Sequence, residues 1–249
     1  MTNGPTRREG RPLLPGRRLG ATGGAALGEA ARQARAPWAA SVAGILFAIL
    51  FTGAMALLRS SPVGTQDDSA LVRLFAEGGD WPIVVGGLYL GPFAGITFLW
   101  FVAVVRDQVG EREDRFFATV FLGSAILFVA LLFAALAVAT TPTVAVRYLD
   151  LRAPTAEEAH LTRTLAYTLL FAFATRAAAV FLFSTATLGL RTQTFPRWFA
   201  LTGYAAGLIL LLVVSFWDWV ILLLPAWVLV ISVAILRRER ALRDVPDAG

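Results

Sequence analysis

The apolar residues of this 249-residue chain fall into long blocks separated by short polar segments. Within the blocks, neither the two-residue alternation of a strand nor the 3.6-residue rhythm of a surface helix is sustained. Blocks of this length are typical of helices that cross a bilayer, whose apolar core is about 30 Å thick. The pattern predicts an all-α, polytopic membrane protein, a bundle of six transmembrane helices. The predicted spans are residues 38–58, 83–105, 116–139, 161–190, 199–215 and 220–236.

Polar segments flank this predicted transmembrane domain, which covers residues 37–236. Residues 1–36 are rich in Gly, Ala, Pro and Arg, and they lack a sustained apolar face. We expect this segment to be a disordered, basic tail whose arginines set the topology of the chain. Contact of the same arginines with anionic lipid headgroups is the alternative, and the two are compatible. Residues 237–249 form a second polar tail.

Two of the predicted spans depend on local signals. Thr155 to Glu158 has the pattern of a capping box, so the fourth helix should begin near Ala156 and run to about Leu190, a length of roughly 50 Å. Such a helix must tilt or project from the membrane. The last apolar block would be too long for one span, and we divide it at Phe216–Trp219, where Asp218 suits a turn exposed to water.

Arginine supplies all 22 basic residues and indicates the orientation of the chain. With the amino terminus in the cytoplasm, sixteen arginines fall in cytoplasmic segments, five fall outside and one lies within a span. Because cytoplasmic loops of membrane proteins carry the excess of basic residues, we expect both termini in the cytoplasm. The exclusive use of arginine indicates a GC-rich genome, and hence a multi-pass protein of a bacterial inner (cell) membrane.

The loop between the first two spans contains a short amphipathic element. Leu71, Leu74 and Phe75 would share one side of a helix that Asp68 caps and Gly78 ends. This pattern predicts a helix lying on the membrane surface.

A glycine ladder marks the second span. Gly87, Gly91 and Gly95 recur every four residues and leave one helix face bare. Such spacing lets a neighbouring backbone approach closely, and we prefer packing within one chain to a dimer face. We expect Pro92 to kink this helix and Pro225 to kink the last one.

Few side chains of this sequence could catalyse a reaction or bind a metal ion. The chain has no cysteine and one histidine, His160, and no acidic residue lies within a predicted span. We therefore predict no catalytic residues, no metal site and no cofactor, and we do not expect an enzyme. The net charge of +5 does not imply nucleic acid, because cytoplasmic arginine already explains it.

Arg176 is the one charged residue predicted deep within a span. Burying it at the bilayer centre costs about 2.5–3.5 kcal/mol on insertion scales, and this cost requires compensation. One interpretation is that Arg176 donates to backbone carbonyls freed by a proline kink and holds helices together. The other is that it binds an anionic ligand, with Tyr89 and Tyr204 as neighbours. Further hydroxyl candidates are Thr97, Ser124 and Thr202.

Two stretches carry a family resemblance. Residues 176–204, from Arg-Ala-Ala-Ala-Val-Phe through Phe-Pro-Arg-Trp-Phe-Ala-Leu-Thr-Gly-Tyr, resemble a family of uncharacterised bacterial six-span integral membrane proteins. Residues 117–125, Phe-Ala-Thr-Val-Phe-Leu-Gly-Ser-Ala, are similar to the third span of that family. The family has no assigned activity, so the resemblance implies a polytopic membrane protein and no site residues.

Three functions compete at this point. The leading hypothesis is a non-catalytic accessory or scaffold protein in the cell membrane, with membrane lipids as its expected partners and no nucleic acid. The alternative is a small-molecule or lipid transporter, or a binding protein, in which Arg176 contacts an anionic ligand. Transporters often contain internal repeats, and the two halves of this chain show none. A membrane enzyme is the least favoured class.

Overall fold

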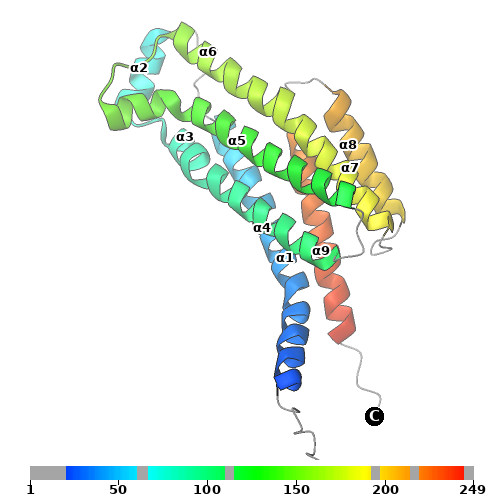
Figure 1. Cartoon of the computed structure of the whole chain (residues 1–249). Coiled ribbons are helices and arrows are strands. Elements are labelled where there is room, and N and C mark those ends of the chain that lie inside the picture. The colour runs from blue at the N-terminus through cyan, green and yellow to red at the C-terminus, as the bar shows by residue number, and fades with distance from the viewer. Residues whose placement is uncertain (1–20, 61–66, 110–114, 192–196, 214–218, 244–249) are drawn as a thin grey trace, which may run out of the picture. The chain divides into compact units, whose positions relative to one another are not determined.

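A computed structural model describes residues 21–60, 67–109, 115–191, 197–213 and 219–243. The chain divides into two units, residues 1–34 and 35–249, and the description below concerns the second. Every element of the described residues is a helix (Figure 1). The elements are α1 (Ala21–Ser60), α2 (Asp68–Ala76), α3 (Trp81–Ile83), the π-helix η1 (Val84–Leu90), α4 (Gly91–Val109), α5 (Arg115–Leu149), α6 (Ala156–Tyr167), the π-helix η3 (Thr168–Ala174), α7 (Thr175–Arg191), α8 (Arg197–Leu212), the 3-10 helix η4 (Val220–Leu222) and α9 (Leu223–Arg243).

Five helical segments are long and apolar enough to cross a membrane. They are Trp38–Ser60, Trp81–Arg106, Ala118–Leu149, Ala156–Arg191 and Val220–Arg237. The apolar helix α8 is shorter, with 16 residues. The described chain therefore has the all-α architecture of a multi-pass membrane protein.

Helix α5 is longer than the sequence pattern predicts. We expected the third span to end at residue 139 and a loop to occupy Thr140–Pro154, but the helix continues to Leu149. Pro142 lies inside it. The hydroxyls of Thr140 and Thr141 donate to carbonyls of Leu136 and Ala137, and these local hydrogen bonds accompany the helix through the proline.

The ends of the bundle also differ from the predicted boundaries. Helix α1 begins at Ala21, inside the segment predicted to be a disordered tail, and α9 runs on to Arg243. Residues 1–20 and 244–249 lie outside the described residues. Helix α8 ends at Leu212, three residues before the predicted end, and the predicted turn at Phe216–Asp218 also lies outside the described residues.

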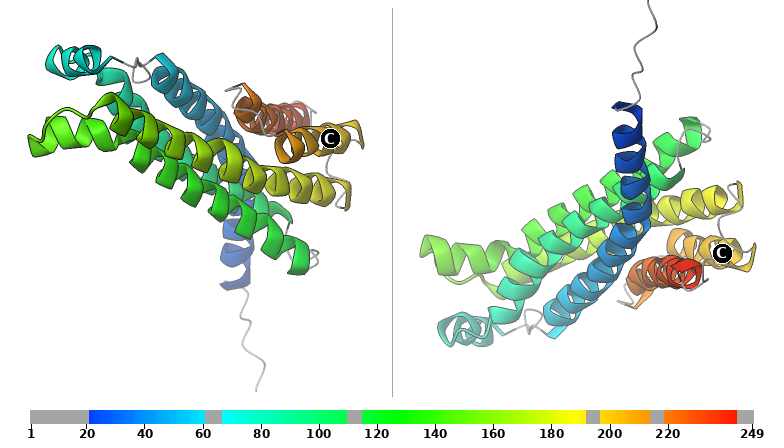
Figure 2. Two further views of the ribbon diagram at one scale, coloured as in Figure 1. Left: turned by 90° about the horizontal axis from the view of Figure 1, so that it is seen from above. Right: turned by 90° about the horizontal axis from the view of Figure 1, so that it is seen from below.

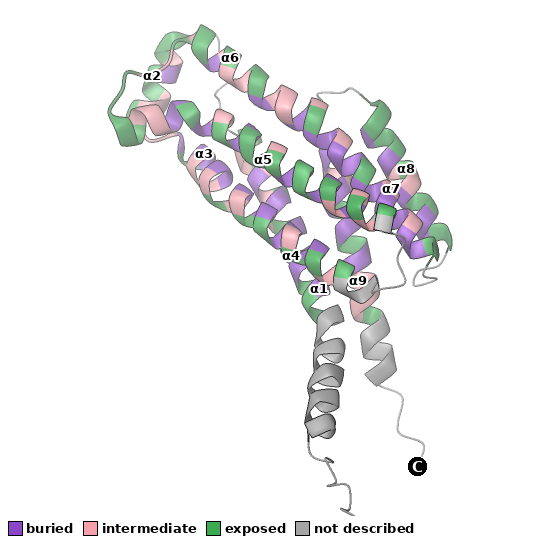
Figure 3. Cartoon of the chain, viewed as in Figure 1, coloured by how far each residue is buried: buried purple, intermediate pink, exposed green. Residues whose placement is uncertain are grey.

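Phenylalanine fills the centre of the bundle. Phe98 of α4 packs against Phe47 of α1, Phe128 of α5 and Phe181 of α7, with ring centroids 4.8, 5.2 and 5.0 Å away. All four side chains are fully buried. Figure 3 shows the same division, with buried residues on the facing sides of these helices and exposed residues on their outer sides. These contacts join four helices around one aromatic core.

The two prolines predicted to kink helices act differently. Before Pro92 the helix widens into the π-helix η1, where the amide of Gly91 bonds to the carbonyl of Gly86. A proline lacks the amide hydrogen and crowds the preceding turn, and the wider turn relieves this conflict. Pro225 is the third residue of α9, and the first turn of a helix tolerates proline. Pro225 therefore lies in the first turn of α9 and not in the middle of a helix, where we expected it to cause a kink.

The glycine ladder packs against α5. A Cβ atom added at Gly87, Gly91 or Gly95 would lie 2.4 Å from the side chain of Thr140, Leu136 or Phe133, respectively. The neighbouring Gly86 faces α1, where an added Cβ would lie 3.0 Å from the carbonyl oxygen of Ala54. The bare face of this helix is therefore occupied by helices of the same chain.

Small residues also join α7 to α8, which lie side by side in the two views of Figure 2. A Cβ atom at Gly207 would lie 3.2 Å from the carbonyl oxygen of Ala179, and one at Gly203 would lie 3.1 Å from Cβ of Ala186. The register of these contacts makes the two helices antiparallel. It also brings the Leu212 end of α8 to about the level of Arg176.

Candidate functional site

One end of the bundle holds α2, the start of α6 and the ends of α1 and α5, and we call it the crevice end. Asp67, and not Asp68 as the sequence suggested, caps α2: its carboxylate accepts from the amide of Ser69 at 2.9 Å. Hydrogen bonds from Ser69 hold the pKa of Asp67 below its ordinary value. Asp68 instead accepts a hydrogen bond from the amide of Ala156, and so ties α2 to the start of α6. Gly78, at φ +70°, ends α2 as predicted.

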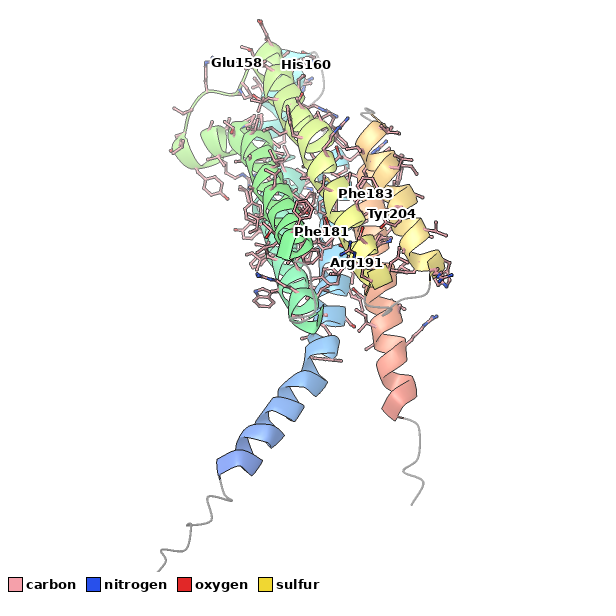
Figure 4. All side chains as sticks on the ribbon, turned by 45° about the vertical axis from the view of Figure 1, so that its right-hand side comes forward. Glu158, His160, Phe181, Phe183, Arg191 and Tyr204 are labelled. Carbon is pink, nitrogen blue, oxygen red and sulfur yellow. The ribbon has the colours of Figure 1, made fainter. Side chains whose placement is uncertain are left out.

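Two ion pairs fix the loops at this end. The Nη2 atom of Arg147 lies 2.6 Å from Oδ1 of Asp80, whose side chain is only 1% exposed. Arg152 binds both carboxylate oxygens of Glu158, at 2.6 and 2.9 Å. Glu158 also completes the predicted capping box with Thr155. Figure 4 shows Glu158 at this end of the long helix formed by α6, η3 and α7, with Arg191 at the other end.

Below these loops lies an apolar crevice of about 100 Å³. The end of α1, Ile83, the second half of α5, α6 and η3 form its walls. Ala135 and Ala139 of α5 and Ala159 and Ala166 of α6 leave the space, because larger side chains at these positions would fill it. Of the sixteen described residues that line the crevice, twelve are apolar and none is acidic.

The crevice carries two arginines. The guanidinium carbon of Arg59 lies 5.3 Å from the ring centroid of Trp219, and that of Arg163 lies 5.1 Å from the ring of Tyr167. Arg163 also donates to the hydroxyl of Tyr167 at 3.0 Å. Stacking on an aromatic face holds each guanidinium in place. The arrangement places two positive charges beside an apolar slot.

Arg176 does not line the crevice. Its Nη1 atom donates to the carbonyl oxygen of Phe171 at 2.7 Å and to the hydroxyl oxygen of Thr175 at 3.0 Å. Both partners belong to its own helix, at the end of the π-helix η3. A π-helical turn disturbs the ladder of backbone hydrogen bonds, so a carbonyl there can accept from side chains. The predicted use of backbone carbonyls is present, but the carbonyl comes from η3 and not from a proline kink.

The two tyrosines proposed beside Arg176 lie elsewhere. The hydroxyl of Tyr204 bonds to that of Thr187 at 2.7 Å, and its ring packs on Phe183 (Figure 4). Tyr89 is 54% exposed on the outer face of η1. The structure therefore does not bring Arg176, Tyr89 and Tyr204 into one site.

The other hydroxyls named as candidates also bond within their own helices. Thr97 donates to the carbonyl of Ala94, and Ser124 donates to that of Phe121. Thr202 donates to the carbonyl of Phe199. These hydrogen bonds satisfy polar groups inside an apolar bundle, and none of these three hydroxyls bonds to Arg176.

His160 lies near the start of α6, at the crevice end (Figure 4). Its Nε2 atom is buried and has no hydrogen-bond partner in the described structure. No group of three or more His, Cys, Asp or Glu residues that could hold a metal ion occurs among the described residues.

A scan against protein-family models and searches of the curated proteins and of the solved structures find no match to this chain. Its interpretation therefore rests on the geometry of its own residues.

Sequence reasoning did not identify the crevice. In the sequence, Arg59 and Arg163 counted only among the arginines that indicate the orientation of the chain. The spacing of Arg163 and Tyr167, four residues apart on one helix, is the signal that could have paired them. No local signal could have joined Arg59 to Trp219, because these residues are 160 positions apart.

Proposed function

We propose that this protein crosses the bacterial inner membrane six times, with both termini in the cytoplasm, and acts as a non-catalytic accessory or scaffold protein. The arginine distribution supports the orientation. Membership in the family that residues 176–204 resemble is part of the same proposal.

The packing of the first and last helices supports an even number of crossings. A Cβ atom at Gly44 of α1 would lie 2.0 Å from Oγ of Ser232 and 3.1 Å from Val228, both in α9. Arg59, at the end of α1, stacks on Trp219, just before η4 and α9. The two helices are therefore antiparallel. Since α8 is antiparallel to α7, it fits as the fifth crossing despite its 16 residues, a length of about 24 Å.

An exposed stripe on η1 and α4 supports the scaffold role, and it is the observation that carries this part of the proposal. Tyr89, Phe93, Ile96 and Trp100 are 54%, 55%, 41% and 64% exposed. Their spacing places them on one helix face, opposite the glycine ladder. The Tyr89 hydroxyl forms no hydrogen bond to any described residue, and an unpaired hydroxyl facing hydrocarbon is unfavourable. Contact with a partner helix would pair it.

Site-specific photocrosslinking in native membranes tests this role. A photoreactive residue in place of Phe93 should give one adduct of defined mass, because the stripe contacts a partner helix. The same residue in place of Ile49, which is 63% exposed on α1, is the matched control and should give none. Identical adduct patterns from the two positions, or no protein adduct from Phe93, would refute the scaffold role.

The second candidate function is the binding of an anionic amphiphile. The crevice and its two arginines favour it, and they move the candidate contact from Arg176 to Arg59 and Arg163.

A further inference from the structure

The geometry points to a contact between copies of this chain, in which the exposed stripe on η1 and α4 of one copy packs against a second exposed face, on α5 of the next copy. We call this second face the α5 seam. It consists of six exposed residues: Gly123, Leu127, Ala130, Ala134, Ala137 and Thr141. The inference rests on the proposed scaffold role, and it names the partner of the stripe as a second copy of this chain.

The α5 seam has the spacing and the side chains of a helix-packing surface. Its residues recur at alternating intervals of four and three, the repeat that keeps one helix face against a neighbouring helix. From Ala130 to Thr141 its side chains are small, and a Cβ atom added at Gly123 would meet nothing within 4 Å. Small residues let a second helix approach closely in a membrane, and no described helix of the same chain covers this face.

The stripe has a matching spacing and the opposite shape. Its four residues follow one another at intervals of four, three and four, and three of them are aromatic. Figure 3 shows exposed residues along the outer sides of both α4 and α5. Large side chains fill the space above alanines, whereas two stripes of large side chains facing each other would keep their helices apart. Shape complementarity therefore favours a contact between stripe and seam.

The stripe and the seam lie at the same depth in the membrane. The glycine ladder sets the register of α4 against α5, with Gly91 opposite Leu136. Because these two helices are antiparallel, Phe93, two residues after Gly91, lies level with Ala134, two residues before Leu136. The rest of the stripe follows the same register. All copies of one chain insert with the same orientation, so levels that match within one chain also match between two copies.

This contact also provides a partner for the Tyr89 hydroxyl. In the same register Tyr89 lies level with the part of the seam between Ala137 and Thr141. A side chain on a helix leans toward the amino end of that helix, which for α4 is the Thr141 side. The Thr141 hydroxyl donates to the carbonyl of Ala137 at 2.8 Å, and its oxygen can still accept. A hydrogen bond from Tyr89 to this oxygen satisfies the phenol within the hydrocarbon.

The contact is heterologous. The stripe lies opposite the glycine ladder and points away from α5 of its own chain, whereas the seam lies on α5 itself. One copy therefore uses its stripe toward one neighbour and its seam toward another, and the contact repeats along a row or a ring. With about half of each side chain exposed, the stripe buries on the order of 400 Å² and the two faces about 800 Å², the size of a reversible association. The contact is therefore best measured in the membrane.

Disulfide formation in native membranes tests the contact, because the full chain has no native cysteine. In the double variant Phe93→Cys, Ala134→Cys, oxidation should shift the chain from monomer to a ladder of dimers, trimers and larger species on a non-reducing gel. Each single variant should stay monomeric, since its cysteine meets none on the neighbouring copy. The bond does not close within one chain, because the body of α4 separates the two positions and a disulfide needs Cα atoms within about 7 Å.

Control variants test the depth and the shape of the contact. Phe93→Cys with Gly123→Cys keeps both faces but separates the cysteines by 11 residues of α5, about 16 Å, and should give no ladder. Ala137→Leu, added to the Phe93→Cys, Ala134→Cys variant, fills the seam and should abolish the ladder. Ala205→Leu makes the same change at an exposed position of α8 and should leave the ladder intact.

Three results would overturn the inference. A disulfide dimer of the single Phe93→Cys variant would assign a contact between two stripes. A double variant that stays monomeric would exclude a second copy as the partner. A ladder undiminished by Ala137→Leu would place the contact away from the seam. The scaffold role fails separately: a photocrosslink from Phe93 to a different protein would keep that role and contradict a second copy, whereas no protein adduct at all would remove both.

Discussion

Substitution of the ladder glycines by alanine should give a graded loss of stability set by the neighbour on α5. An alanine in a helix is favoured over glycine by about 1 kcal/mol, whereas overfilling a packed interface costs about 1–3 kcal/mol. Each added Cβ would start 2.4 Å from a side-chain carbon of α5. The freedom of that side chain to move therefore decides the net effect.

The three neighbours differ in this freedom. Thr140, opposite Gly87, is β-branched and 2% exposed, and its hydroxyl is held by the Leu136 carbonyl at 2.8 Å. Leu136, opposite Gly91, is buried but has more rotamers. Phe133, opposite Gly95, is 37% exposed and can swing outward. We expect Gly87→Ala to destabilise by about 2 kcal/mol, Gly91→Ala by less, and Gly95→Ala to be near neutral.

The assay is the apparent Tm of detergent-purified protein, followed as loss of the monodisperse species on heating. For a protein of this size, 2 kcal/mol corresponds to a fall of about 4–8 °C. Gly123→Ala is the control, since nothing lies within 4 Å of an added Cβ there, and it should raise the Tm slightly. A Gly87→Ala variant as stable as Gly123→Ala would refute packing against α5, and a change in oligomeric state alone would indicate a dimer face instead.

Three further substitutions test other parts of the structure. Arg176→Leu should leave the abundance of the protein in the membrane unchanged or raise it. The free energy of inserting the charge, about 2.5–3.5 kcal/mol, exceeds the stabilisation of about 1 kcal/mol that each hydrogen bond of Arg176 supplies. Reduced abundance on an immunoblot would contradict this. Asp80→Ala should lower the Tm and open the turn at residues 77–80, between α2 and α3, to limited proteolysis; an unchanged digestion pattern would argue against the buried ion pair. Thr155→Ala should cost about 1 kcal/mol through loss of the capping box, measured as a lower Tm; an equal fall for the exposed Thr164→Ala would show that the cap contributes nothing specific.

The helices were readable from the sequence because lipid imposes a strong rule on the chain. Every backbone polar group must be satisfied within the membrane, so long apolar blocks become helices. The start of α6 was predictable for a different reason. The two hydrogen bonds of the capping box at Thr155 lie within four residues, so the local sequence alone indicates the first residue of the helix.

Where sequence reasoning went wrong, local rules competed with one another. Pro142 and the polar residues around it indicated a loop, but threonine hydroxyls and the surrounding helices keep α5 intact to Leu149. Asp67 and Asp68 both fit a cap, and only the position of α6 decides which carboxylate serves α2.

The crevice depends on tertiary structure alone. Arg59, Arg163 and the alanines of α5 come from three separate helices, and each has an ordinary local explanation. Arg176, by contrast, is conspicuous in the sequence because it interrupts an apolar block. The described hydrogen bonds of Arg176 stay within its own helix and depend on the π-helical turn at η3. The spacing of residues in the sequence does not predict such a turn.

The six-crossing arrangement is tested most directly by the sidedness of single cysteines, for which a chain without native cysteine is suited. Ser69→Cys in α2 reports on the crevice end, and Ala248→Cys reports on the carboxyl terminus. A membrane-impermeant maleimide applied to intact cells should label the first and, until the membrane is permeabilised, not the second. Labelling of Ala248→Cys in intact cells would contradict six crossings, because α8 would then not cross the membrane.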